Sequence, residues 1–101
     1  MAKNEPRKAS ELLWGAVTQT VKAVALIANR QITTHADFFS FTRTLANDLN
    51  DKNLYFDFVS LNDLHRNFYD GFVPADVIPS LFEKSVQYIK RLDMIISEKA
   101  S

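Results

Sequence analysis

Residues 10–28, SELLWGAVTQTVKAVALIA, carry the pattern that decides the fold. Apolar residues recur in this stretch at intervals of three and four, which places them on one face of an α-helix. The first apolar stripe consists of Leu13, Val17, Val21, Val24 and then Ile27 or Ala28. A second stripe lies beside it and consists of Leu12, Ala16, Ala23 and Leu26. Because the two stripes form one wide apolar surface, we expect this helix to be central.

The narrow polar side of the same helix contains a glycine. It is made up of Lys8, Glu11, Gly15, Gln19 and Lys22. A glycine inside a helix costs about 1 kcal/mol relative to alanine, so Gly15 needs a reason. Close packing by another helix is the simpler explanation, and close approach by a ligand is the alternative.

The helix that contains this stretch is expected at about 7–29. Three more helices are predicted downstream of it, at 35–50, 54–71 and 75–98. Thr34 and Asp37 resemble a capping box at the start of the second helix, and Gly71 marks the end of the third. The inward residues of these three helices are predicted to be Phe38, Phe41, Leu45 and Leu49, then Leu54, Phe58, Leu61, His65, Phe68 and Phe72, then Ile78, Leu81, Phe82, Ser85, Ile89, Leu92 and Ile96. Short connections between helices of this length predict an all-α fold, an antiparallel up-and-down four-helix bundle in one domain spanning 1–101.

Composition excludes several classes of function. The chain has 101 residues, equal numbers of basic and acidic side chains, two histidines and no cysteine. A net charge of zero argues against broad binding to DNA, and the lack of cysteine removes disulfides and thiolate chemistry. We expect no metal, no cofactor, no membrane span and a cytoplasmic location. Because a domain of this size buries little surface, we expect a homodimer.

Two groups of residues are candidates for chemistry. Arg30 and His35 have the spacing of a phosphate-neutralising arginine and a proton-transferring histidine, although a cap-region role is simpler for His35. His65 lies on the inward face of the third helix, where a hydrogen-bonded core role is the simpler interpretation. Its neighbours Arg66 and Asn67 could bind phosphate and a base beside it.

These considerations define the predicted site residues. Catalytic candidates are His65, His35 and Arg30. Predicted ligand-binding residues are Glu11, Lys22, His65, Arg66 and Asn67. Predicted packing or interface residues are Trp14, Gly15, Phe68 and Tyr69.

Two strings in the chain resemble signature segments of the archaeal PaREP family. They are residues 9–16, ASELLWGA, and residues 64–69, LHRNFY. The resemblance implies membership of the HEPN (nucleotide-binding) superfamily, with an up-and-down bundle that is often dimeric. Ribonucleases of that superfamily carry an arginine followed a few residues later by a histidine. Arg66 and Asn67 begin such a string, but residues 68–73 contain no histidine, so no catalytic residue is carried over.

The leading prediction is a dimeric HEPN-like module that binds a nucleotide, RNA or a protein partner and has no established catalysis. A metal-independent endoribonuclease of a toxin–antitoxin type system is one alternative. A purely structural helical interaction module is the other.

Overall fold

The computed structural model describes residues 5–70 and 75–100, and these residues form helices without any strand. The elements are α1 (Glu5–Ile27), α2 (His35–Asp48), α3 (Asn53–Tyr69), the 3-10 turn η1 (Ala75–Val77) and α4 (Ile78–Ala100). The all-helical prediction is therefore confirmed. Gly71, which was predicted to end the third helix, and Phe72, which was predicted to face inward, lie outside the described residues.

The start of α2 is fixed by the capping box that the sequence predicts. The Thr34 hydroxyl accepts a hydrogen bond from the backbone N–H of Asp37 at 3.2 Å. The Asp37 carboxylate in turn accepts from the backbone N–H groups of Thr33 and Thr34, at 2.9 and 3.0 Å. These bonds lower the pKa of Asp37, the backbone bond from Thr33 most. They also satisfy N–H groups that the first helical turn leaves without partners.

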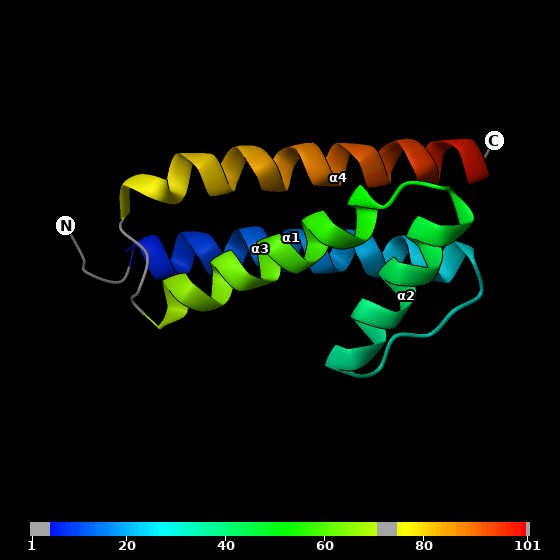
Figure 1. Cartoon of the computed structure of the whole chain (residues 1–101), viewed down its shortest axis with the longest axis horizontal. Coiled ribbons are helices and arrows are strands. Elements are labelled where there is room, and N and C mark those ends of the chain that lie inside the picture. The colour runs from blue at the N-terminus through cyan, green and yellow to red at the C-terminus, as the bar shows by residue number, and fades with distance from the viewer. Residues whose placement is uncertain (1–4, 71–74, 101) are drawn as a thin grey trace.

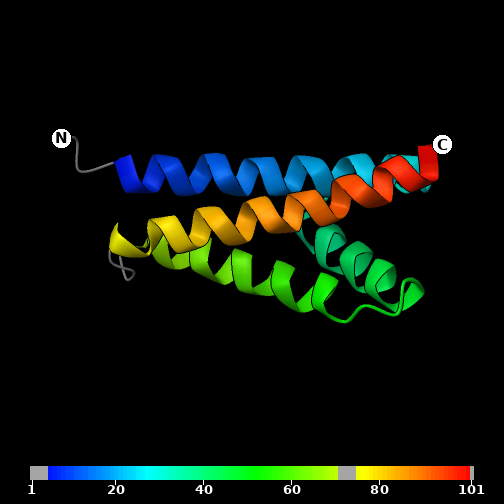
Figure 2. The same cartoon turned by 90° about the horizontal axis from the view of Figure 1, so that it is seen from above.

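The direction of the helices differs from the predicted up-and-down bundle. In Figures 1 and 2, α1 and α4 lie side by side and run the same way, while α3 runs the opposite way. Contacts agree, since Ala28 and Arg30, which follow the end of α1, line one hollow with Lys99 near the end of α4. The cause is the non-helical segment 28–34, which brings the chain partway back before α2 begins. Successive helices therefore do not simply alternate in direction.

The core is organised around one aromatic ring. Phe58 on α3 is fully buried, and its ring contacts rings from all three other helices. The ring centroids of Trp14 on α1 and Phe39 on α2 lie 5.1 and 5.2 Å away. Tyr88 on α4 lies at 6.2 Å, and its hydroxyl donates a hydrogen bond to the backbone carbonyl of Leu54. Aliphatic side chains complete the core, including Val17, Val21, Val24, Leu45, Leu61, Leu81 and Leu92.

Several residues predicted to face inward lie on the surface instead. Leu12 and Leu26 are 76% and 71% exposed, so the second stripe of α1 is not buried and α1 is not surrounded by the other helices. Phe82 is 56% exposed. The buried positions of α4 are Leu81, Ser85, Tyr88 and Leu92; Phe82 follows Leu81 by one residue, which rotates it by about 100° away from the core. None of the described helices is long and apolar enough to cross a membrane.

Candidate functional site

His65 lies where the end of α3 meets the start of α1. Its Nδ1 atom is 2.9 Å from the hydroxyl oxygen of Ser10, a hydrogen bond in which either atom can be the donor. The imidazole stacks on the indole of Trp14, with the ring planes 15° apart and the centroids 5.6 Å apart. Burial lowers the pKa of His65, while a hydrogen bond with the backbone of Ser10 and the charge of Glu11 act in the opposite direction. The neutral imidazole is thus the favoured form.

This Ser10–His65 pair differs from a nucleophile and its base. Ser10 is 1% exposed, so a substrate cannot reach its hydroxyl. None of the hydrogen bonds found among the described residues joins His65 to a carboxylate that would orient the ring for proton transfer. The arrangement is a polar contact that joins α1 to α3.

Among the predicted ligand-binding residues, Lys22 lies apart from the other four. Glu11 is exposed near His65, and Arg66 and Asn67 are exposed on α3. Lys22 lies eight residues beyond Trp14, about 12 Å along the helix axis. Its ammonium instead faces α2, 5.8 Å from the centre of the Phe38 ring.

The Arg30–His35 pair is also not assembled. His35 is exposed and packs edge-on against Phe39, with the centroids 5.2 Å apart. The Arg30 guanidinium lies over the ring of Phe41, 5.9 Å from its centre. Phe39 and Phe41 are two residues apart and so point to different sides of α2, about 200° around its axis. The two side chains therefore contact different sides of α2.

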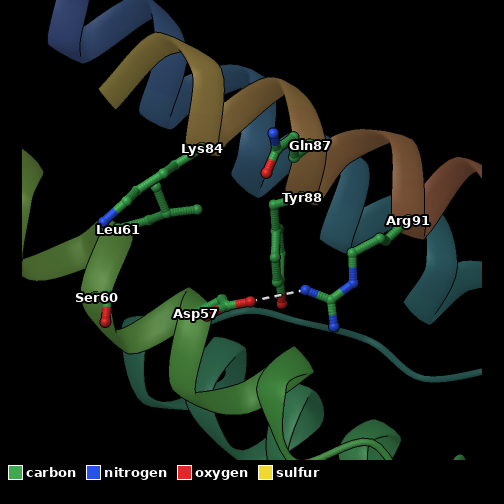
Figure 3. Close-up of a pocket in the computed structure, with 7 residues that line it drawn as sticks. All are labelled: Asp57, Ser60, Leu61, Lys84, Gln87, Tyr88 and Arg91. Carbon is green, nitrogen blue, oxygen red and sulfur yellow. Dashed lines mark hydrogen bonds and ion pairs between the residues drawn. The ribbon is translucent and has the colours of Figure 1, made fainter. Parts of the chain in front are cut away.

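Residues that sequence reasoning missed form a cleft between α3 and α4 (Figure 3). The cleft has a volume of about 240 Å³ and is lined by Asp57, Ser60, Leu61, Lys84, Gln87, Tyr88 and Arg91. Arg91 donates to Asp57 at 2.7 Å and to Asp51 at 3.0 Å. Because two carboxylates already hold this guanidinium, the cleft is better suited to joining α4 to α3 than to binding an anion. The pairing spans more than 30 residues of sequence, which no local spacing reveals.

Ser10 was also missed, although the chain carries a signal for it. It lies seven residues before Val17, so it continues the buried stripe of α1 toward the N-terminus. A small polar residue at a core position requires a partner, because burying an unpaired hydroxyl is unfavourable. His65 is that partner. The side chains of Phe68 and Tyr69, two predicted interface residues, lie outside the described part of the chain.

The outer face of α1 is an apolar surface that the other described helices do not cover. We use this name for Leu12, Ala16, Gln19, Ala23 and Leu26. Leu12, Gln19 and Leu26 follow one another at intervals of seven residues, so they lie in one row along the helix. Gly15 adjoins this row, and a Cβ atom placed on it would meet no heavy atom of the described residues within 4 Å. Within the described part of the chain, no other helix packs closely enough to require a glycine here.

These features describe an all-α protein with an aromatic core and a bare apolar face on its first helix. The chain belongs to the archaeal PaREP1/PaREP8 family, whose model matches residues 1–92. No curated protein and no solved structure matches this chain.

Proposed function

We propose that this protein is a helical interaction module that works as a homodimer, and that the outer face of α1 forms the dimer interface. The observation that carries the proposal is the exposure of Leu12 and Leu26, at 76% and 71%, in one row on one helix. Isolated exposed leucines are ordinary on protein surfaces. Here the two leucines flank Gln19 in one row, and Gly15, Ala16 and Ala23 lie alongside it, so a second helix can approach this surface closely.

The row also has the symmetry that a closed dimer requires. Leu12 and Leu26 both lie seven residues from Gln19, and Gly15 and Ala23 both lie four residues from it. A second α1 packed antiparallel with Gln19 on the two-fold axis would bring Leu12 against the partner's Leu26. It would bring Gly15 against the partner's Ala23, where the smallest side chains permit the closest approach. A two-fold interface needs this kind of self-complementary surface.

The proposed interface supplies a reason for Gly15. A glycine inside a helix costs about 1 kcal/mol relative to alanine, and no described residue of the chain lies close enough to Gly15 to require it. In the dimer, a larger side chain at position 15 would push the two helices apart. Gly15→Leu should therefore weaken the dimer, although the side chain has space in a single subunit.

Cysteine cross-linking tests the proposal, because the natural chain has no cysteine. Gln19→Cys should form a disulfide-linked dimer under mild oxidation, since the two copies would meet at the two-fold axis. Leu12→Cys alone should not, because antiparallel packing would separate its two copies by about 21 Å along the helix. The combination of Leu12→Cys and Leu26→Cys should cross-link again.

Met94→Cys is the matched control for this experiment. Met94 is 65% exposed on α4 and does not belong to the outer face of α1. If Met94→Cys cross-links as readily as Gln19→Cys, the disulfide reports random collision and the proposed interface is rejected. Cross-linking of Leu12→Cys alone would contradict the antiparallel arrangement.

Two finer statements belong to the same proposal. Grouping the fold with HEPN-like bundles is supported by four helices in a chain of the PaREP1/PaREP8 family. The absence of catalysis is supported by the separate positions of Arg30, His35 and His65. Incubation of RNA with the wild-type protein tests the latter. Cleavage that is lost in His65→Ala or His35→Ala would favour the endoribonuclease alternative.

A further inference from the structure

The elbow between α2 and α3 contains a hollow that the proposed dimer does not use. Its volume is about 500 Å³, and it is lined by Arg43, Ala46, Asn47, Lys52, Tyr55 and Phe56. Figure 1 shows the elbow where α2 ends and α3 begins, whereas His65 lies near the other end of α3. The hollow is thus separate from the candidate residues that the sequence singled out.

Local geometry brings these side chains together. Arg43, Ala46 and Asn47 follow at intervals of three and four and so share one side of α2. The turn after α2 is tight, because Asn50 has a left-handed backbone conformation with φ of 53°. The carboxylate of Asp51 accepts a hydrogen bond from the backbone N–H of Asn53 at 3.2 Å, which fixes the start of α3. The first turn of α3 then presents Tyr55 and Phe56 beside α2.

The composition of the hollow matches the chemistry of a nucleotide. Phe56 is 57% exposed, and its ring lies 5.8 Å from that of Tyr55 at an angle of 61°. Exposed aromatic rings stack with unpaired bases, whichever base is present. Arg43 and Lys52 contribute two positive charges, and no carboxylate is among the described residues that line the hollow. The α3–α4 cleft differs here, because its arginine is already held by two carboxylates.

We propose that this hollow binds an unpaired nucleotide, with the base stacked on Phe56 and the phosphate held by Arg43 and Lys52. The Asn47 amide, which has both a donor and an acceptor, lies on the wall where it can contact the edge of the base. The same chemistry is offered by a free nucleoside monophosphate and by single-stranded RNA. Two cations at one elbow account for local phosphate binding in a chain whose net charge is zero.

Fluorescence anisotropy with a short labelled single-stranded RNA tests this site. At low salt, Phe56→Ala should weaken binding about fivefold or more, because base–aromatic stacking is lost. Arg43→Gln and Lys52→Gln together should flatten the salt dependence, which two phosphate contacts would set at a slope of about −1.4 in log affinity against log salt. Unlabelled single-stranded RNA, adenosine monophosphate and duplex RNA are then added as competitors. Equal competition by the monophosphate and the single strand indicates a site for a free nucleotide, whereas stronger competition by the single strand indicates a site for RNA.

Two matched variants control for general effects. Phe82→Ala removes a ring of nearly equal exposure, 56%, on α4, and Lys84→Gln removes an exposed lysine from the α3–α4 cleft. Both should bind RNA like the wild type. The proposal is overturned if the wild type binds neither ligand, if Phe56→Ala binds unchanged, if Phe82→Ala weakens binding equally, or if duplex RNA competes as well as single-stranded RNA. Phe56→Ala should also leave the dimer intact. A negative result for nucleotide binding therefore does not count against the proposed dimer, and the reverse also holds.

Discussion

Replacing Phe58 with alanine tests whether one ring holds the four helices together. Phe58 is fully buried and contacts Trp14, Phe38, Phe39 and Tyr88. Truncating a buried phenylalanine to alanine costs about 3–5 kcal/mol, through lost apolar burial and the cavity left behind. Domains of this size are stable by only about 5–15 kcal/mol in total. The variant should therefore lose a large share of its folding free energy.

Thermal unfolding followed by circular dichroism measures this effect. For a domain of about 100 residues, each kcal/mol shifts Tm by about 4–8 °C, so Phe58→Ala should lower Tm by roughly 12–40 °C. Phe58→Leu should lose less, because it keeps most of the apolar volume. All samples need the same protein concentration, since dimer formation couples to apparent stability.

Phe56→Ala is the matched control, two residues earlier on the same helix. It removes the same side chain from a position that is 57% exposed, so its free energy of unfolding should change by no more than about 0.5 kcal/mol. If Phe58→Ala lowers Tm no more than Phe56→Ala does, the aromatic cluster does not organise the core as described. An unchanged Tm for both would refute the assignment of Phe58 to the interior.

Three further predictions concern single contacts. Thr34→Ala should reduce the free energy of unfolding by about 1 kcal/mol in urea titrations, because the N-cap bond to Asp37 is lost; an unchanged midpoint would contradict this. Because burial lowers the pKa of His65 from the 6.5 of the unfolded chain, its contribution to stability should be fully present above pH 6.5 and decline as the pH falls below it. His65→Gln should flatten that part of the pH profile, and an equally steep profile would be inconsistent with a neutral, half-buried imidazole. In a monomeric Leu12→Glu background, Gly15→Ala should raise the free energy of unfolding by about 0.5–1 kcal/mol, because the added Cβ meets nothing and favours the helix; a lower Tm would show that another part of the chain does approach Gly15.

Local sequence signals predicted the helices well, because helix formation depends on neighbours. The capping box at Thr34 is set by residues within one turn, and the buried row Val17, Val21 and Val24 follows from spacing alone. The relative direction of the helices could not be predicted from residue spacing. It depends on the path of residues 28–34, which carry no regular pattern and are too long a connection to force a reversal.

For the candidate functional surfaces too, features within one helix were predicted from the sequence, whereas contacts between helices were not. His65 was recognised as an inward residue, but its partner Ser10 required knowledge of which ends of α1 and α3 meet. An apolar stripe predicts that a helix face will be buried, but it does not indicate whether the same chain or a second chain buries it. Leu12 and Leu26 were therefore predicted to lie in the core, whereas in a single subunit they face outward. The hollow at Phe56 joins two helices across a turn, so spacing within either helix does not reveal it.

The central claim is that the outer face of α1 joins two copies of this chain. Light scattering coupled to size exclusion, across a range of protein concentrations, measures it most directly. We expect the wild type to approach twice the 11.5 kDa mass of the chain, Leu12→Glu to be monomeric, and Met94→Glu to behave like the wild type. A wild-type mass of 11.5 kDa at every concentration would contradict the claim, as would a Leu12→Glu dimer of unchanged affinity.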